Sequence, residues 1–406
     1  MNNSENLPRP VLPKNVSDTI KTLNSSGFSA YLAGGCVRDF LLGKTPSDYD
    51  VATSAKPAQV KKIFKRVYDT GIEHGTVTVI AGGCHIEVTT FRADGDYIDN
   101  RRPESVTFIC DIKSDLARRD FTVNAIAYHP DEGFLDYFGG ARDLNLKIIR
   151  CVGRPDARFR EDALRMLRAV RFCAVLDFTL DSGTRRSIAK NARLLKNISA
   201  ERVRDELIKI ITSKNPGVLR LLIKYKLLRY FDEDFFMLIK RNQRAVISGL
   251  KKCPEEKTAR LCALFRFENS GAARQTLIKL RLDNKTVNDA LRVCERLKEK
   301  PPKNLYETRR AMAQTGDAPF LTALLIKKAL CGKALAKNFA MYGRVLKNND
   351  CRSLKQLSVN GDDLAQIGLT GQEIGAALRR ALDFVMKNPK NNKKETLLAL
   401  IKNEKS

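Results

Sequence analysis

The chain has 406 residues, of which 43% are hydrophobic and 29% are charged, a balance typical of a globular protein with several domains. Lysine and arginine outnumber aspartate and glutamate by 73 to 46, which gives a formal net charge of +27. A surplus of this size predicts an anionic partner. We expect nucleic acid rather than a membrane, because the sequence contains neither an amphipathic anchor nor an apolar run long enough to span a bilayer.

The cysteines and the N-terminal segment bear on the cellular compartment. Ten cysteines are scattered along the chain without a C-x-x-C pair, and there are three histidines, so a zinc site is not favoured. Residues 1–10 are polar and lack the apolar core of a secretory signal. We therefore expect a cytoplasmic protein whose thiols are free in a reducing compartment.

Residues 32–50, which read L-A-G-G-C-V-R-D-F-L-L-G-K-T-P-S-D-Y-D, carry the most chemistry. Gly34 and Gly35 allow the backbone to come close to a phosphate, and a helix that begins at Val37 would present free N–H groups to it. Arg38 adds a planar, permanently charged group that suits phosphate. The segment therefore predicts a phosphate-binding turn.

Two aspartates end this segment. If residues 49–52 form a strand, Asp48 and Asp50 point to the same face of it. Two carboxylates on one face do not easily both stay ionised unless a cation lies between them, and Mg²⁺ is typically held by one or two carboxylates plus substrate phosphates. The pair therefore predicts a divalent-metal site. An isolated Asp-x-Asp is common in turns, but this one follows Gly-Gly-x-Val-Arg-Asp in the same strand–turn–helix–strand unit.

This unit resembles the first signature of the nucleotidyltransferase superfamily that includes DNA polymerase beta. It looks most like the bacterial CCA-adding tRNA nucleotidyltransferases (class II, the tRNA nucleotidyltransferase/poly(A) polymerase family). The resemblance implies an α/β nucleotidyltransferase head with a DNA polymerase beta-like mixed sheet, followed by all-α neck, body and tail domains. We expect the head at residues 1–153, the neck with a nucleotide-selecting template at 154–215, and the tRNA-binding body and tail at 216–406.

A hairpin is predicted next, because β-rich runs at residues 76–80 and 85–91 flank the sequence A-G-G-C. If this hairpin lies beside the strand of Asp50, Glu87 becomes a third carboxylate at the metal. From the residues alone, an exposed strand glutamate is an equally good interpretation. The resemblance favours the catalytic role.

Residues 94–103, D-G-D-Y-I-D-N-R-R-P, predict a polar loop. In the family that the chain resembles, a flexible loop at this place matters for the change from adding C to adding A. The loop therefore favours a complete CCA-adding enzyme over a partial one, with a plain surface loop as the alternative.

Residues 115–128, D-L-A-R-R-D-F-T-V-N-A-I-A-Y, predict a helix. An ordinary charged helix face would explain its Arg-Arg-Asp. The run R-R-D-F-T-x-N-A is also similar to the family's second motif, which grips the ribose and phosphates of the nucleotide. The resemblance implies that Arg119 contacts the nucleotide and that Asp120 and Asn124 have ribose-binding or structural roles. A strand, a glycine turn and a closing strand are expected to follow within residues 136–149.

Residues 158–172, R-F-R-E-D-A-L-R-M-L-R-A-V-R-F, predict one helix because they contain neither glycine nor proline. Side chains spaced three apart lie on one side of such a helix, and here they are Asp162, Arg165, Arg168 and Arg171. An exposed helix with an ordinary Asp–Arg pair is the alternative interpretation.

The Asp162–Arg165 pair has a specific chemical use. A carboxylate accepts a hydrogen bond from the exocyclic amine of cytosine or adenine, and an arginine donates to ring or carbonyl acceptors. Cytosine and adenine both place an amino group beside a ring acceptor, whereas uracil and guanine present the opposite arrangement. Such a pair can therefore select C and A without a nucleic-acid template. E-D-x-x-R also matches the family's protein template, and Arg168 and Arg171 match its further nucleotide-contacting arginines.

The rest of the chain is less informative. Residues 199–211 predict a packed amphipathic helix, whose charges we interpret as structural. Beyond Pro216 the sequence is helical, and the resemblance implies body and tail domains that hold the tRNA acceptor arm by its backbone. The sequence does not predict the oligomeric state.

Together these features predict Mg²⁺-dependent, template-independent addition of CCA to the 3′ end of tRNA from CTP and ATP, with release of pyrophosphate. A poly(A) polymerase and a partial enzyme that adds only C or only A are the nearest alternatives, because they share the metal motif. From a different class, a non-catalytic RNA-binding protein could keep the fold. An antibiotic-modifying nucleotidyltransferase would not need a charge of +27 or a long basic helical half.

Overall fold

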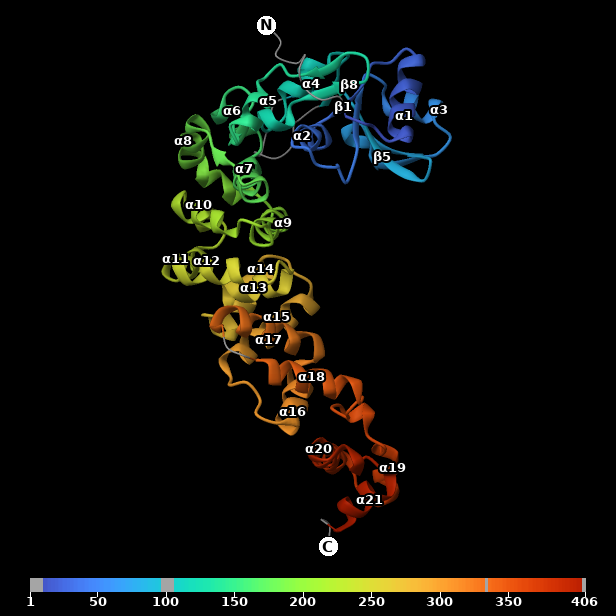
Figure 1. Cartoon of the computed structure of the whole chain (residues 1–406), viewed down its shortest axis with the longest axis vertical. Helices are drawn as coiled ribbons and strands as arrows, with labels where there is room; N and C mark the ends of the chain where they lie inside the picture. The colour runs from blue at the N-terminus through green and yellow to red at the C-terminus, as the bar shows by residue number, and fades with distance from the viewer. Residues whose placement is uncertain (1–9, 96–105, 333–334, 404–406) are drawn as a thin grey trace. The chain divides into compact units, whose positions relative to one another are not determined.

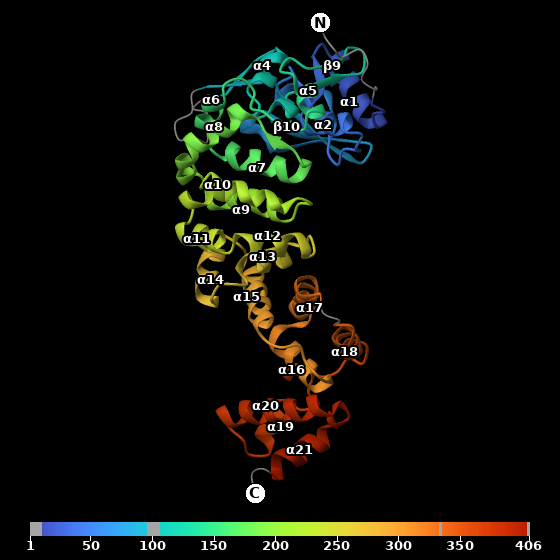
Figure 2. The same cartoon turned by 60° about the vertical axis from the view of Figure 1, so that its left-hand side comes forward.

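The computed structural model describes residues 10–95, 106–332 and 335–403 (Figure 1). The chain forms two compact units, Met1–Lys240 and Arg241–Ser406. The first unit contains a mixed sheet followed by helices, and the second is helical in the segments that the structure describes (Figure 2). This arrangement confirms the predicted α/β head followed by helical regions.

A seven-stranded sheet forms the base of the first unit. Its strands are β1 (Ala30–Ala33), β2 (Asp50–Thr53), β3 (Val67–Gly71), β4 (Thr76–Ala81), β5 (Cys84–Thr90), β8 (Ala127–His129) and β9 (Gly133–Leu135). They lie in the order β3-β4-β5-β2-β1-β8-β9, with β2 parallel to β5 and the other neighbours antiparallel. The predicted hairpin is therefore β4–β5, and it lies beside the strand of Asp50, as the Glu87 hypothesis requires.

Short helices accompany this sheet: α1 (Lys14–Ser25), α2 (Gly35–Leu41), α3 (Pro57–Ile63), α4 (Ile112–Ala117) and α5 (Gly140–Asn145). In α1, Val16, Ile20 and Leu23 recur at helical spacing, and all three are buried. Further strand pairs are β6 (Arg92–Asp94) with β7 (Val106–Phe108), and β10 (Ile148–Ile149) with β11 (Thr179–Leu180). The loop predicted at residues 94–103 begins at the end of β6, and from residue 96 onward it lies outside the described residues.

The helix predicted for residues 115–128 is wrong. α4 ends early, and a 3-10 turn then leads into β8. Asp120 lies after the end of α4, and its Oδ1 accepts a hydrogen bond from the backbone N–H of Phe121 at 2.9 Å, which competes with renewed helical pairing in this segment. Thr122 then donates its backbone N–H to the carbonyl of Arg150 at 2.9 Å, which holds this segment beside the chain that follows β10.

The strand–turn–strand predicted for residues 136–149 is also wrong. Gly139, with a φ of 75°, leads into α5 instead of reversing the chain into a hairpin. Asp136 stabilises the start of this helix, because its carboxylate accepts the backbone N–H groups of Gly140 and Ala141 at 2.8 and 2.9 Å. The closing strand is present as β10.

The single helix predicted for residues 158–172 is two helices, α6 (Pro155–Glu161) and α7 (Leu164–Leu176). Asp162 separates them: its backbone is extended, with φ −137° and ψ 105°, and its Oδ1 accepts the N–H of Leu164 at 3.0 Å. This local hydrogen bond competes with continuation of the helix. The three-residue spacing therefore does not place Asp162 on the same helix as the arginines that follow.

The remaining helices of the first unit are α8 (Ser182–Asn191), α9 (Ala200–Ile211), α10 (Leu219–Lys224) and α11 (Glu233–Arg241), the last of which reaches the boundary between the units. α9 packs against α7. It buries Val203, Leu207, Ile210 and Ile211, which confirms the amphipathic helix predicted there.

The helices of the second unit are α12 (Gln243–Lys252), α13 (Lys257–Phe265), α14 (Ser270–Lys279), α15 (Asn284–Lys298), α16 (Leu305–Thr315), α17 (Asp317–Cys331), α18 (Ala336–Lys347), α19 (Gly361–Gln366), α20 (Gly371–Lys387) and α21 (Lys394–Asn403). A buried ion pair joins several of them. Arg309 of α16 contacts Asp350, which follows α18, at 2.7 Å and donates to the carbonyl of Met386 in α20 at 2.8 Å. Among the described residues of both units, no helix is long and apolar enough to cross a bilayer.

Candidate active site

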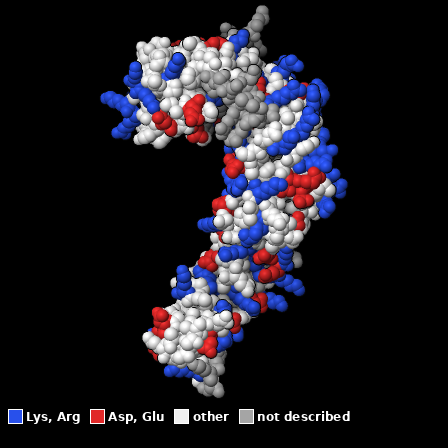
Figure 3. All heavy atoms as spheres, turned by 180° about the vertical axis from the view of Figure 1, so that it is seen from behind, with Lys and Arg blue, Asp and Glu red and all other residues white. Residues whose placement is uncertain are grey.

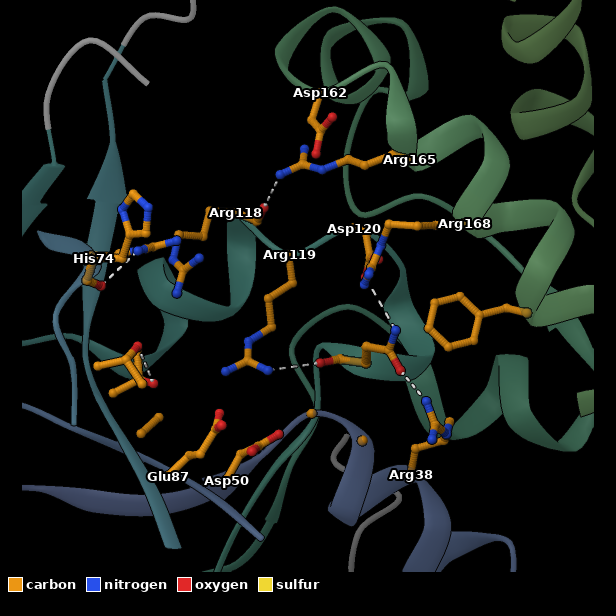
Figure 4. A pocket seen from close by; sticks show the side chains of 18 of the residues that line it. Arg38, Asp50, His74, Glu87, Arg118, Arg119, Asp120, Asp162, Arg165 and Arg168 are labelled. Carbon is orange, nitrogen blue, oxygen red and sulfur yellow. Dashed lines mark hydrogen bonds and ion pairs between the residues drawn. The ribbon is translucent and has the colours of Figure 1, made fainter. Parts of the chain in front are cut away.

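A cavity of about 620 Å³ opens in the first unit, between the sheet and the helices that follow it (Figure 4). Side chains from β2 and β5 line one side, the start of α2 and the segment after α4 a second, and residues around α7 and α9 a third. The sequence-predicted residues that line it are Gly34, Gly35, Arg38, Asp50, Glu87, Arg119, Asp120, Asn124, Asp162, Arg165 and Arg168. The predicted residues Asp48 and Arg171 do not line it.

Two carboxylates lie together in this cavity. Asp50 and Glu87 are register partners in the parallel pair β2–β5, and both side chains reach the cavity (Figure 4). Burial and then the nearby charge of Glu87 raise the pKa of Asp50, an effect that Arg119 partly offsets. A cation between the carboxylates would relieve this repulsion, so the pair fits a hard divalent ion held by carboxylates and phosphate oxygens.

Asp48 is placed differently. β2 begins at Asp50, so the two-residue alternation of a strand does not extend back to Asp48. Its Oδ2 accepts a hydrogen bond from the Ser47 hydroxyl at 2.9 Å. Within the described ranges, no three His, Cys, Asp or Glu side chains are grouped closely enough to hold a metal ion. The carboxylates that the structure brings together are therefore Asp50 and Glu87.

The glycine turn is packed against an arginine. Gly34 has a φ of 87°, which favours glycine, and a Cβ at this position would lie 2.6 Å from Nη1 of Arg119. That guanidinium contacts the buried carboxylate of Asp115 at 3.2 Å and donates to the carbonyl of Asn124 at 3.4 Å. Any larger residue at Gly34 would therefore displace Arg119 from the cavity wall.

A chain of hydrogen bonds links three elements of the wall. Arg38 of α2 donates to Oδ1 of Asn124 at 2.8 Å, and Nδ2 of Asn124 donates to Oδ1 of Asp120 at 3.2 Å. Arg168 of α7 closes the chain, with Nη2 at 2.6 Å from Oδ2 of Asp120. Burial alone would raise the pKa of Asp120, but Arg168 and its hydrogen bond outweigh it, so the pKa is lowered. The chain fixes both guanidinium groups in place.

The Asp162–Arg165 pair is assembled differently from the expected i, i+3 pair. Both residues line the cavity, but Asp162 binds Arg202 of α9, with Nη2–Oδ2 and Nη1–Oδ1 distances of 2.7 and 3.2 Å. Arg165 contacts Glu161 at 2.5 Å and donates to the carbonyl of Arg118 at 3.1 Å. Other partners therefore hold the carboxylate and the guanidinium that face this part of the cavity.

Arg171 faces away from the cavity. Its Nε lies 2.6 Å from Oε2 of Glu206 in α9, and its guanidinium lies 4.1 Å from the centre of the Phe172 ring. Burial lowers the pKa of Arg171, and Glu206 partly offsets that effect. Arg38 and Arg168 lie 5.5 and 5.6 Å from the same ring, so Phe172 contacts three guanidinium groups and supports two that line the cavity.

Comparison with known proteins identifies the family. Family models match for the poly A polymerase head domain at residues 30–150, the probable RNA and SrmB-binding site of polymerase A at 177–235, and a putative tRNA nucleotidyltransferase domain 2 at 252–401. The chain is 37% identical to the CCA-adding enzyme of Lactiplantibacillus plantarum over 93% of each chain, and 37% identical to that of Geobacillus thermodenitrificans over 94% of each. The chain belongs to the family of CCA-adding enzymes.

Its fold also matches this family. The crystal structure of the Bacillus stearothermophilus CCA-adding enzyme in complex with CTP aligns over 97% of this chain and 98% of that chain, with a TM-score of 0.85 and 31% identity. These findings confirm the family predicted from residues 32–50 and from the later motifs. CCA-adding enzymes are nucleotidyltransferases, a family that generally uses a divalent metal, and the Asp50–Glu87 pair suits that requirement.

Several residues that line the cavity had no predicted role in the site: His74, Thr76, Thr89, Arg92, Arg118, Phe172 and Arg202. Arg202 adds a detail to the interpretation of the charges of residues 199–211 as structural, because it lines the cavity and holds Asp162 in an ion pair. The sequence held a weak signal for Arg202, because Arg202 and Glu206 are spaced four apart and so lie next to each other on the helix that buries Val203 and Leu207. Thr89 likewise follows Glu87 at the two-residue period of a strand face.

Proposed function

We propose that this chain adds CCA to the 3′ end of tRNA without a nucleic-acid template, from CTP and ATP and with release of pyrophosphate. The observation that carries the proposal is a single cavity that holds both the Asp50–Glu87 carboxylates and the side chains of Asp162 and Arg165. The first pair suits the reacting phosphate and the second suits the base. A nucleoside triphosphate is proposed to span the distance between them.

Gly34, Gly35, Arg38 and Arg119 are proposed to bind the triphosphate. The glycine turn lets the backbone approach the phosphates, and the two arginines supply planar, permanently charged donors. Asn124 and Asp120 hold Arg38 through the hydrogen-bond chain of the wall, which favours a positioning role for both.

Mg²⁺ is the divalent ion that we propose for Asp50 and Glu87, because carboxylates and triphosphate oxygens are its usual ligands. Asp48, the other ligand predicted from the sequence, is close enough for its charge to contribute to the raised pKa of Asp50, and we propose it as a further ligand. When bound, the ion makes the 3′-hydroxyl more nucleophilic and neutralises charge on the transferring phosphate and the pyrophosphate. The arginines of the wall orient the triphosphate and reduce its charge.

Asp162 and Arg165 are proposed to select the base. Asp162 accepts a hydrogen bond from the amino group that cytosine and adenine share, and Arg165 donates to the adjacent ring acceptor. The ion pair with Arg202 presents the Asp162 carboxylate as an acceptor. Arg168 is proposed to contact the nucleotide from the cavity wall, and Arg171 to support it through Phe172.

The RNA partner is proposed to bind largely through its phosphate backbone. The net charge of +27 supports this, and lysine and arginine side chains are spread over both units on the face shown in Figure 3. The proposed substrate, tRNA that lacks its 3′ end, is processed where tRNA is made and used, so we propose a cytoplasmic location.

The test is to incubate the protein with tRNA that lacks CCA, a divalent ion, and CTP and ATP singly or together. Products are resolved to one nucleotide. Addition of two C residues and one A followed by a stop is expected. A long A tail would instead indicate a poly(A) polymerase. A stop after two C residues or after one A would indicate a partial enzyme. No product, with RNA binding retained, would indicate a non-catalytic RNA-binding protein.

A further inference from the structure

The cavity contains a region on the Glu87 side that the nucleotide-binding residues do not account for. This region, which we call the His74 end, is lined by His74, Thr76, Thr89, Arg92 and Arg118. Figure 4 shows His74 and Arg118 on one side of the labelled residues, Asp162 and Arg168 on the other, and Arg119 between them. The cavity therefore has two ends that meet near the carboxylate pair.

The sheet makes the His74 end continuous with the carboxylate pair. Thr89 follows Glu87 by two positions in β5, so both lie on the same face of the strand. Thr76 of β4 is the antiparallel partner of Thr89, and their hydroxyl oxygens are 3.0 Å apart. Two hydroxyl groups of the cavity lining thus lie on the strand pair that carries Glu87.

One buried carboxylate organises the cations of the His74 end. Oδ1 of Asp115, a residue that is 1% exposed, accepts hydrogen bonds from Nε and Nη2 of Arg118 at 3.0 and 2.7 Å. The backbone N–H of Arg92 donates to the same oxygen at 3.3 Å, and the Arg92 guanidinium donates to the carbonyl of His74 at 2.7 Å. Arg119 contacts the other oxygen at 3.2 Å, so two guanidinium groups, those of Arg118 and Arg119, share this one carboxylate, while the Arg92 guanidinium lies at the His74 carbonyl. The His74 end therefore carries net positive charge.

We propose that the His74 end binds the last internucleotide phosphate of the acceptor RNA and presents the terminal ribose to the carboxylate pair. The inference rests on the proposed function, in which the nucleoside triphosphate occupies the Asp162 end. Nucleotidyl transfer joins two substrates at one phosphorus, with the attacking oxygen in line with the leaving pyrophosphate. With the base and triphosphate at Asp162 and Arg119, the part of the cavity next to Glu87 is left for the RNA.

The chemistry of the His74 end suits this occupant. Arg92 and Arg118 provide charged donors for a phosphate, and the Thr76 and Thr89 hydroxyls provide partners for the 2′-hydroxyl of RNA. In the reaction the 3′-oxygen forms a bond to the α-phosphorus, the bond from that phosphorus to the pyrophosphate oxygen breaks, and the hydroxyl proton passes to solvent. The His74 end holds the attacking ribose while this exchange takes place.

The test compares two acceptors, tRNA lacking CCA with a normal last internucleotide linkage and the same RNA with an uncharged methylphosphonate there. For the wild type, the neutral linkage should raise the KM for RNA about tenfold, as expected for loss of a charge-assisted hydrogen bond. Arg118→Gln should raise the KM for normal RNA by a similar factor of about ten and should be insensitive to the neutral linkage. The KM for CTP should stay within about twofold for this variant.

His74→Gln and Thr89→Val repeat the comparison if Arg118→Gln does not fold, each with a rise of roughly threefold in the KM for RNA. His85→Gln is the matched control, because His85 lies on the same face of β5 as Glu87 but outside the cavity, and it should change nothing. The inference is overturned if the neutral linkage raises the KM for RNA by the same factor in the Arg118 variant as in the wild type. It is also overturned if the variant shows a raised KM for CTP instead of a raised KM for RNA. Absence of CCA addition by the wild type on normal RNA would overturn the proposed function, an outcome distinct from either.

Discussion

The two units of the protein use buried ion pairs for different purposes. In the first unit, the pairs Arg168–Asp120 and Arg202–Asp162 line a cavity, so these charged side chains remain partly accessible to a ligand. In the second unit, Arg309–Asp350 is closed between helices, with side chains 7% and 4% exposed. Burial of charge is costly in both places. We infer that ligand binding offsets this cost in the first unit, whereas in the second the pair fixes the arrangement of helices.

The largest expected effect distinguishes a residue needed for nucleotide addition from residues needed for tRNA binding. Asp50→Asn should lower kcat/KM for nucleotide addition on the order of a thousandfold or more, because the metal ion loses a charged ligand. Binding of tRNA, measured by titration without nucleotides, should change less than about twofold. Asp48→Asn is the matched comparison, and an equal loss would show that Asp48 turns into the site with substrate bound. Retention of a tenth of the activity by Asp50→Asn would rule out the metal assignment.

The second unit should respond through stability alone. Arg309→Ala leaves the Asp350 carboxylate buried without its partner, so the free energy of unfolding should fall by about 3–5 kcal/mol. Urea unfolding measures this effect, and the kcat of the fraction that remains folded should be unchanged. Arg229→Ala is the control, because the Arg229–Glu233 pair is exposed to solvent and its loss should leave the urea midpoint nearly unchanged. A large loss of kcat in folded Arg309→Ala would contradict a purely structural role.

Selection of the base should respond more weakly than the chemical step. Asp162→Asn places a donor where the proposal needs an acceptor, so the preference for CTP over UTP should fall roughly tenfold to a hundredfold. The ratio of kcat/KM for the two nucleotides measures it. Asp156→Asn is the matched control, because Asp156 lies on α6 outside the cavity, where it binds Lys190. A uniform loss with all nucleotides and an unchanged ratio would count against the template role.

The smallest effects are expected from the pH dependence of Asp50. Burial and Glu87 raise the pKa of Asp50, and a protonated carboxylate does not bind a cation. As the pH falls through this raised pKa, the apparent metal affinity should weaken by up to about tenfold per pH unit. The concentration of metal that gives half the maximal rate, followed across pH, measures it. If the required metal concentration stays constant until the pH falls to the pKa of an ordinary aspartate, the burial of Asp50 is contradicted.

In the absence of metal, the raised pKa of Asp50 also affects folding stability. This stability should decrease as the pH rises, whereas metal affinity should increase. A folded-state pKa above the unfolded value means that stability is fully present at low pH and is lost as the pH rises through the folded pKa. Asp50→Asn should therefore raise the unfolding temperature near pH 7, on the order of 1 °C. The difference should vanish below the pKa of an unfolded aspartate, which thermal scans at the two pH values will test.

Much of the first unit was predictable because short runs of sequence determine it. The glycine turn at Gly34 and the β4–β5 hairpin are local, and the family motifs led to most of the cavity residues. The breaks in the predicted helices near Asp120 and Asp162 were missed because each aspartate side chain binds a nearby backbone N–H group in place of helical pairing, with no glycine or proline to mark the position.

The partner of Asp162 was missed for a different reason. Arg202 lies 40 residues further along the chain and reaches Asp162 because α9 packs on α7. Its spacing of four residues from Glu206 is the one local signal, and that spacing does not indicate Asp162 as the partner. The second unit shows the same limit at Arg309–Asp350, because this pair depends on which helices become neighbours.

The parallel pairing of β2 with β5 also determines at what stage of synthesis and folding the carboxylate pair forms. Asp50 and Glu87 are register partners, yet α3, β3 and β4 lie between them in the chain. A nascent polypeptide therefore carries Asp50 for some time before its partner has been synthesised, and the unfolded chain offers no preformed place for the ion. Divalent ions should for that reason bind the native state selectively, stabilise it by mass action, and relieve the carboxylate repulsion that opposes closure of the sheet.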